Sequence, residues 1–161
     1  LETVGLRYFN VFGPKQDPNG TYAAVIPKFI ARFLNKEDMT INGDGEHSRD
    51  FTYIENVIQA NIKALLTDNK KGINQVYNVA FGENSSLNQL VKVIKKELDE
   101  CGLNTDSSKV HYGPQRQGDV KHSLANILKA NKLLEYKPEV SFEEGIKRLV
   151  KYSTKLKEKK K

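Results

Sequence analysis

The sequence predicts a mixed α/β domain, and three observations carry this prediction. Short runs of β-branched and aromatic residues alternate with stretches whose apolar positions recur at three- and four-residue spacing. The chain has 161 residues, enough for one domain with a hydrophobic core. Its composition, 38% hydrophobic and 29% charged, is that of an ordinary globular protein without an apolar run long enough to span a membrane.

The first part of the chain predicts a strand, a loop and a helix. Residues 3–11 ("TVGLRYFNV") carry little charge, which indicates a mostly buried strand. Residues 12–20 contain two glycines and two prolines and predict a loop. From Ala24 to Leu34 the apolar residues fall at helical spacing. Pro27 suits the first turn of this helix, where its missing N–H would have no acceptor.

The middle of the chain continues the alternation. Residues 39–54 predict two short strands around the turn Gly43-Asp-Gly45, and 75–80 predict another strand. Between them lies an amphipathic helix, whose expected buried face consists of Ile54, Val57, Ile58, Ile62 and Leu65.

The last part predicts three helices and one strand. Ser86 and Gln89 form a capping box that opens a helix continuing to Leu98. Residues 109–114 predict a short strand, and apolar spacing from Leu124 to Leu134 predicts the next helix. A second capping box, Ser141 with Glu144, opens a final helix through Val150.

Charge and motifs argue against several functional classes. The net charge is +6, but residues 155–161 hold five lysines and one glutamate and so account for +4 of it. Lysines at a helix end suit the macrodipole, and a nucleic-acid surface would instead show a basic stripe with interleaved aromatics. The three histidines show no metal-ligand spacing, and no glycine-rich phosphate cradle is present. The single cysteine, Cys101, favours a reducing, cytoplasmic location.

Two arginines near loops are the first candidate ligand groups. Arg49 follows the glycine turn and Arg116 lies beside Gly118, and a guanidinium offers a fork that matches phosphate oxygens. Asp119 would repel phosphate but suits the diol of a neighbouring ribose. The alternative for Arg49 is a surface salt bridge with Asp50 or Asp44, and the alternative for Arg116 is an ordinary surface arginine.

Asn10 closes the first strand. The simplest interpretation is a turn former before Phe12-Gly-Pro14. In open α/β sheets, however, ligands bind outside the carboxyl ends of the strands, which would place Phe9 and Asn10 at a crevice.

Several motifs together resemble a known family. They are "LRYFNVFGP", "AVIPKFI", "INGDGEHSRDFTYIENV", "YNVAFGENSSLNQL" and "RQGDVKHSLAN". In this order they resemble the C-terminal half of NAD-dependent sugar-nucleotide epimerases of the extended short-chain dehydrogenase/reductase superfamily, above all the UDP-N-acetylglucosamine 4-epimerases. The resemblance implies a Rossmann-type protein whose dinucleotide-binding half precedes Leu1. Residues 1–161 would be the substrate-binding portion, with 1–12 a late strand of the cofactor sheet and 155–161 a basic tail.

The resemblance also implies a reaction. Hydride would pass from C4 of a UDP-hexose to NAD, the 4-keto sugar would turn, and hydride would return to the other face. No tyrosine is followed four residues later by lysine, so the catalytic pair of the family is absent and the fragment alone should be inactive. A related nucleotide-sugar dehydratase or decarboxylase remains an alternative, and a nucleic-acid-binding module is a weaker one. The family implies a cytoplasmic homodimer with no membrane partner.

The resemblance assigns roles by position. Residues expected beside the nicotinamide end of NAD are Tyr8 and Phe9. Residues expected to contact the UDP-sugar are Asn10 near the diphosphate, Ala24, Val25, Ile26, Pro27, Thr40, Ile41 and Asn42 at the uracil, Arg49 and Arg116 at phosphate, Asp119 at ribose and Ser123 beside the sugar.

Ser123 stands where a bulky tyrosine would restrict the family to glucose and galactose. A small residue leaves room for an N-acetyl group at C2, which favours UDP-N-acetylhexosamines. The alternative is that Ser123 caps the helix expected to start at Leu124. The two roles are compatible.

Overall fold

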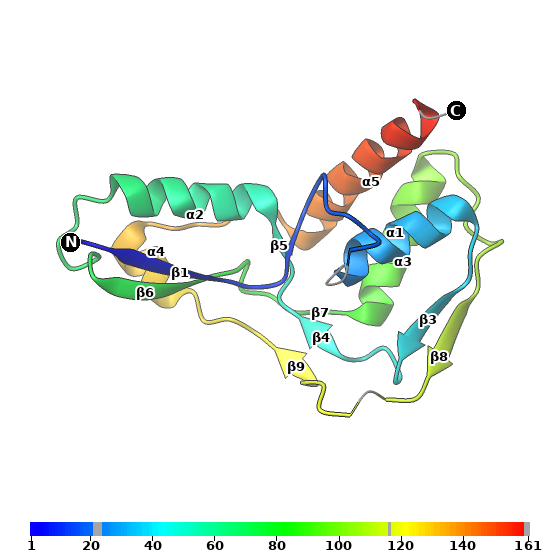
Figure 1. Cartoon of the computed structure of the whole chain (residues 1–161), viewed down its shortest axis with the longest axis horizontal. Coiled ribbons are helices and arrows are strands. Elements are labelled where there is room, and N and C mark those ends of the chain that lie inside the picture. Colours follow the sequence, from blue (N-terminus) through cyan, green and yellow to red (C-terminus); the bar gives the residue numbers. More distant parts are fainter. Residues whose placement is uncertain (21–23, 116, 160–161) are drawn as a thin grey trace.

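A computed structural model describes residues 1–20, 24–115 and 117–159 and confirms the mixed α/β class. The described residues form two lobes joined side by side (Figure 1). The sheet lobe contains β1, β6, α2 and α4, and the helical lobe contains α1, α3, α5, β3 and β8. No helix in the described ranges is both long and apolar enough to cross a membrane.

The sheet lobe is built on two parallel strands. β1 (Val4–Tyr8) pairs with β6 (Gln75–Val79), so that Leu6 lies opposite Tyr77. Helices α2 (Ile54–Leu66) and α4 (Leu128–Leu134) pack on the strands. The buried core of this lobe consists of Val57, Ala60, Tyr77, Val79, Ala130, Leu134 and Tyr136.

The helical lobe packs three helices around a larger core. They are α1 (Val25–Asn35), α3 (Leu87–Glu100) and α5 (Phe142–Glu158). A parallel pair, β3 (Met39–Asn42) with β8 (Val110–Gly113), lies beside them. The core is aromatic at its centre, where the rings of Phe51 and Phe142 stack with centroids 5.6 Å apart. Stacked aromatic pairs stabilise a core beyond the area they bury.

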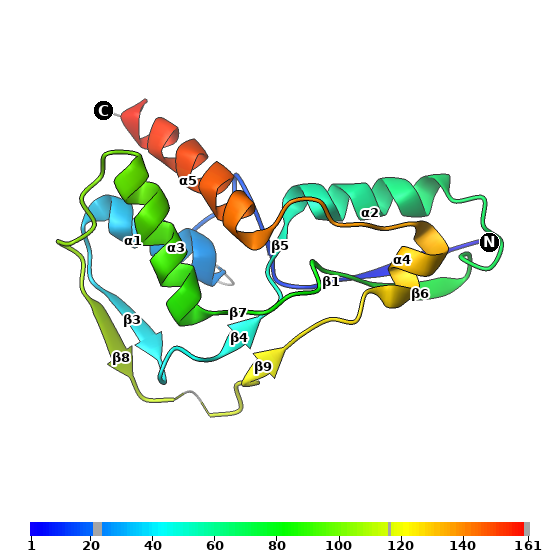
Figure 2. The same cartoon turned by 180° about the vertical axis from the view of Figure 1, so that it is seen from behind.

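Short strands connect the lobes. β2 (Val11–Phe12) pairs with β5 (Thr52–Tyr53). A three-stranded sheet has β4 (Ser48–Arg49) between β7 (Ser85–Ser86) and β9 (His122–Ser123). Figure 2 shows β4, β7 and β9 from behind, between the two lobes.

Two strand predictions need correction. The strand expected at 3–11 is interrupted because Asn10 adopts φ 35°, so the chain turns between β1 and β2. The segment 39–54 contains three short strands rather than two, and α2 already begins at Ile54.

Two helix predictions also need correction. The helix expected from Leu124 starts only at Leu128, because Ser123 lies in β9 and its carbonyl accepts from the backbone N–H of Asp50 at 3.0 Å. Ser123 is therefore not a helix N-cap. On α2 the expected face is wrong in part, because Val57 is buried while Ile62 and Leu65 are 51% and 82% exposed.

The capping boxes behave differently from each other. Ser86 and Gln89 form both reciprocal bonds at the start of α3, as expected. At the start of α5, Ser141 accepts from the N–H of Glu144, but the Glu144 carboxylate instead accepts from Nε of Arg148 at 2.7 Å. This box is therefore only half formed.

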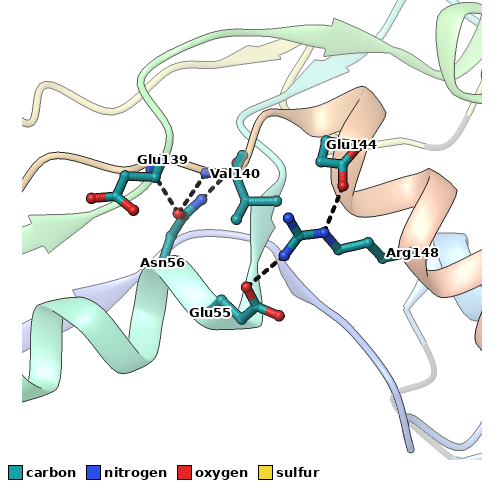
Figure 3. A network of polar contacts seen from close by, with 6 residues as sticks. All are labelled: Glu55, Asn56, Glu139, Val140, Glu144 and Arg148. Atoms are coloured by element: carbon teal, nitrogen blue, oxygen red, sulfur yellow. Dashed lines mark hydrogen bonds and ion pairs between the residues drawn. The ribbon is translucent and has the colours of Figure 1, made fainter.

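Side chains fasten the start of α2 to the start of α5 and the segment just before it (Figure 3). The Asn56 amide oxygen accepts from the N–H groups of Glu139 and Val140 at 3.0 and 3.1 Å, and its nitrogen donates to the Val140 carbonyl at 2.8 Å. Arg148 bridges Glu144 and Glu55, the latter at 2.7 Å. Since α2 belongs to the sheet lobe and α5 to the helical lobe, this network joins the two lobes.

Candidate functional site

A pocket of about 250 Å³ lies where the connecting strands meet the start of α1. We call it the Arg49 pocket. Its walls come from segments far apart in the sequence: the turn after β1, the N-terminus of α1, strand β4 and the loop before β9. Its lining residues are Asn10, Val11, Phe12, Ala24, Val25, Ile26, His47, Arg49, Phe51, Leu87 and Asp119.

Arg49 supplies the fixed positive charge of the pocket. One terminal nitrogen donates to the carbonyls of Ser48 at 2.9 Å and Lys121 at 3.4 Å. The other contacts Asp119 Oδ1 at 2.6 Å. The alternative role of Arg49, a salt bridge, is thus observed, but its partner is Asp119 rather than Asp44 or Asp50. This pair is partly exposed, with 21% and 40% of the two side chains accessible, so it contributes at most about 1 kcal/mol.

Asn10 lies at the pocket wall because of its backbone conformation. Its left-handed φ of 35°, a conformation that asparagine tolerates, makes the turn expected before Phe12. Its side-chain nitrogen donates to the Asp50 carbonyl at 3.1 Å. The turn-former interpretation is confirmed, and the same turn places Asn10 at the pocket wall.

The start of α1 supplies the apolar wall. Ala24 precedes the helix with extended backbone, and Val25 and Ile26 begin it. The first N–H groups of a helix lack intrahelical acceptors and carry the positive end of its dipole. Pro27 lies within the first turn, as expected, but it is buried and faces a different cavity, between α1 and α5.

Ser123 lies next to Arg49. The two residues are partners in the parallel pair β4–β9. Paired residues of neighbouring strands project from the same face of a sheet, so the half-buried Ser123 side chain shares the Arg49 face. Ser123 is not among the residues that line the pocket.

Other predicted site residues lie elsewhere. Thr40 and Asn42 are exposed on β3, which pairs with β8, and the Ile41 side chain between them is 1% exposed within the core. Tyr8 and Phe9 lie at the carboxyl end of β1, where the Tyr8 ring is 51% exposed.

Arg116 lies outside the described residues. Its convergence with Arg49 on one diphosphate therefore stays a prediction.

Comparisons with known proteins agree with this architecture. A family model described as "NAD dependent epimerase/dehydratase family" matches residues 1–80. A crystal structure of UDP-glucose 4-epimerase from Thermotoga maritima, with UDP-glucose, is 39% identical over 97% of this chain, with a TM-score of 0.85. The chain belongs to the NAD-dependent epimerase/dehydratase family.

Two further relatives of this epimerase/dehydratase chain are named for other sugar nucleotides. A UDP-N-acetylglucosamine 4-epimerase from Methanobrevibacter ruminantium, solved with UDP-N-acetylmuramic acid, is 43% identical over 97% of the chain, with a TM-score of 0.84. A UDP-N-acetyl-alpha-D-glucosaminuronate decarboxylase from Bacillus cytotoxicus is 27% identical over 94% of it.

The chain spans about half the length of the relatives it matches. It covers 47% of both solved structures and 46% of the decarboxylase, and its fold matches the C-terminal part of Rossmann-type epimerases.

Several residues that line the Arg49 pocket were not predicted from the sequence. His47, Phe51 and Leu87 line it, and each looked like an ordinary core or turn residue in the sequence. A usable signal existed for His47 and Phe51, because both lie two residues from Arg49 in an extended segment. Leu87 carried no such signal, since it simply continues the apolar face of α3.

Proposed function

We propose that the protein containing this chain is an NAD-dependent UDP-sugar 4-epimerase, and that this chain supplies most of its sugar-nucleotide pocket. One observation carries the proposal. The Arg49 pocket gathers Asn10, the start of α1, Arg49 and Asp119 in a chain 39% and 43% identical to solved UDP-sugar epimerases. These groups offer a cation for phosphate, a carboxylate for a ribose diol and an apolar wall for a base.

Arg49 is positioned to bind phosphate. Its contacts with the Ser48 and Lys121 carbonyls hold the guanidinium in place before a ligand arrives. Its partly exposed pair with Asp119 is weak, so phosphate oxygens can take over one nitrogen while Asp119 turns to the ribose. A UDP anchor of equal strength in every state does not lower the chemical barrier, but it keeps C4 of the sugar near the cofactor.

The residues at the end of β1 fit a nicotinamide cofactor. β1 and β6 are parallel, and Tyr8 and Phe9 stand at their carboxyl ends, the edge where α/β sheets bind dinucleotides. Tyr8 offers an exposed ring whose hydroxyl is oriented by a 3.0 Å bond to Asn61 Oδ1. Bound there, NAD would accept a hydride from C4 of the sugar and return it. Most of its contacts and the catalytic acid–base pair would come from residues that this chain does not contain.

The Arg49 assignment can be tested with UDP alone. In the full-length gene product we expect Arg49→Ala to weaken UDP binding, measured by isothermal titration calorimetry, by at least about tenfold, because a charge-assisted hydrogen bond is lost. Arg32→Ala is the matched control, since Arg32 is an exposed arginine of α1 that donates to the Asp38 carbonyl at 2.7 Å. An unchanged UDP affinity in Arg49→Ala would contradict the assignment.

We further infer UDP-N-acetylhexosamines as substrates. Ser123 is small and shares a sheet face with Arg49. In this proposal its small side chain leaves space for an N-acetyl group beside the bound sugar. We expect Ser123→Tyr to abolish conversion of UDP-N-acetylglucosamine while sparing UDP-glucose, followed by NMR of the two C4 epimers. Ser123→Ala should convert both. Equal loss of both activities in Ser123→Tyr would defeat the steric explanation.

Decarboxylation is the second candidate, favoured by the decarboxylase relative. Carbon dioxide release from a UDP-glucuronate substrate would identify it, whereas an epimerase retains the carbon. A homodimer is also proposed, and sedimentation of the full-length gene product would test it.

A further inference from the structure

Asp50 is a buried carboxylate beside the Arg49 pocket. Its neighbours Arg49 and Phe51 line that pocket, while Asp50 itself is 0% exposed. Its Oδ1 accepts from the N–H of Phe81 at 3.0 Å, and its Oδ2 accepts from the N–H groups of Gly82 at 3.0 Å and Ala125 at 3.3 Å. Three backbone donors therefore converge on one side chain.

These donors come from different parts of the fold. Phe81 and Gly82 follow β6, at the carboxyl end of the parallel pair, and Ala125 follows β9. The main chain of Asp50 makes two more bonds: its N–H donates to the Ser123 carbonyl at 3.0 Å and its carbonyl accepts from the Asn10 side chain at 3.1 Å. One residue thus contacts the ends of β1, β6 and β9.

The site requires a carboxylate for a physical reason. Burial raises the pKa of Asp50, while the three N–H donors lower it and replace the lost water. A neutral side chain of the same size would leave at least one of these buried N–H groups without an acceptor, which is costly. The bonds therefore hold the ends of β6 and β9 at fixed positions around the carboxylate.

We propose that Asp50 is the positioning residue of the pocket, which holds Asn10, Arg49 and Ser123 in one geometry by fastening β9 and the end of β6 to β4. The identity of the ligand rests on the proposed function. Asp50 does not touch the ligand in this proposal. It acts through the residues on either side of it and through the strand ends that it binds.

The test compares two variants of similar buried geometry in the full-length gene product. Asp50→Asn replaces one acceptor oxygen by an amide nitrogen, which faces backbone N–H groups. Asn56→Asp is the matched control: Asn56 is 2% exposed, carries three hydrogen bonds at the other junction of the lobes (Figure 3), and does not line the pocket. Both should lower the melting temperature.

Only Asp50→Asn should weaken UDP binding, by at least about tenfold at a temperature where both variants are folded. Asn56→Asp should bind UDP within about twofold of the unmodified protein. Unchanged affinity in Asp50→Asn, or equal weakening in both variants, would overturn the proposal. Absence of UDP binding in the unmodified protein is a different result, because it refutes the proposed function before any variant is compared.

A second measurement decides the case if Asp50→Asn does not fold. Amide hydrogen exchange of the unmodified protein should slow at Phe81, Gly82 and Ala125 when UDP is added, because a filled pocket stabilises the same strand ends. The amides of Glu139 and Val140, bonded to Asn56, should exchange at the same rate with and without UDP. Identical exchange at Phe81, Gly82 and Ala125 with and without UDP would overturn the proposal.

Discussion

At the scale of single residues, Arg148 shows how one side chain links two lobes. Its guanidinium contacts the carboxylates of Glu144 and Glu55, both at 2.7 Å, and lies over the Tyr53 ring at 6.0 Å from the centroid. Glu144 lies in the first turn of α5, where a carboxylate also suits the helix dipole. The cluster is exposed to solvent, so its contribution depends on pH and salt.

The pH dependence of this cluster has a definite sign. Arg148 lowers the pKa of Glu144 below its ordinary value of 4.5, so the ionised form is favoured in the folded state. The stabilisation is therefore present above 4.5 and is lost as the pH falls through the lowered pKa. We expect the difference in unfolding free energy between the unmodified chain and Arg148→Met to shrink in acid, measured by urea denaturation. A constant difference at neutral and acidic pH would contradict this.

At the scale of elements, α5 approaches the pocket strands at Gly145. A Cβ at this position would lie 2.7 Å from the tip of the Phe12 ring and 3.0 Å from the Tyr53 ring. Phe12 and Tyr53 pack edge to face with centroids 5.5 Å apart, so neither ring can move freely. The glycine thus sets the distance between α5 and the β2–β5 pair.

Gly145→Ala should therefore destabilise the chain although alanine is the better helix former. We expect a loss of about 1–2 kcal/mol in unfolding free energy, since overpacking exceeds the gain in helix propensity. Lys151→Ala, at an exposed position of the same helix, should change it by less than about 0.5 kcal/mol. Chemical denaturation measures both, and a stabilised Gly145→Ala would show that the rings can rearrange.

Local sequence patterns predicted the elements that depend mainly on contacts between residues close together in the chain. The Ser86 box and the apolar repeat of α3 agree with each other, and both are confirmed. Ser123 was ambiguous because its conformation depends on β4, 74 residues earlier in the chain. The α2 face was misjudged because periodicity identifies apolar positions but not which of them meet another element.

The pocket was predictable only in part, for a related reason. Arg49 and Asn10 stand beside turns, where ligand groups are common, and both line the Arg49 pocket. Asp50 looked like a salt-bridge partner for Arg49. Its bonds to Phe81, Gly82 and Ala125 involve backbone amides, which carry no side-chain signature in a sequence.

At the scale of the whole molecule, the sheet lobe exposes much apolar surface. Ile58, Ile62, Leu65 and Leu66 of α2 are each at least half exposed. A groove of about 580 Å³ runs between α2 and β1, and β1 pairs with β6 alone among the described strands. Parallel sheets are normally covered on both faces and open strand edges favour association, so this surface is suited to further strands and helices.

The chain expressed by itself should consequently self-associate. We expect light scattering after size-exclusion chromatography to show a mass that rises with concentration, because apolar patches of this kind drive association. The double variant Ile62→Lys and Leu65→Lys should remain monomeric over a wider range, whereas Leu103→Lys, outside α2, should not differ from the unmodified chain. A monomer at every concentration would contradict the expectation.

The order of elements along the chain has a practical consequence. The sheet lobe consists of β1, α2, β6 and α4, and the helical lobe consists of α1, β3, α3, β8 and α5, so the two sets alternate along the chain. Neither half of the molecule is a continuous stretch that could be cloned, deleted or exchanged by a single cut. Thermal melting followed in both lobes should therefore give one shared transition. A chimaera that exchanges the Arg49 pocket must exchange its lining segments, which run from Asn10 to Asp119, together.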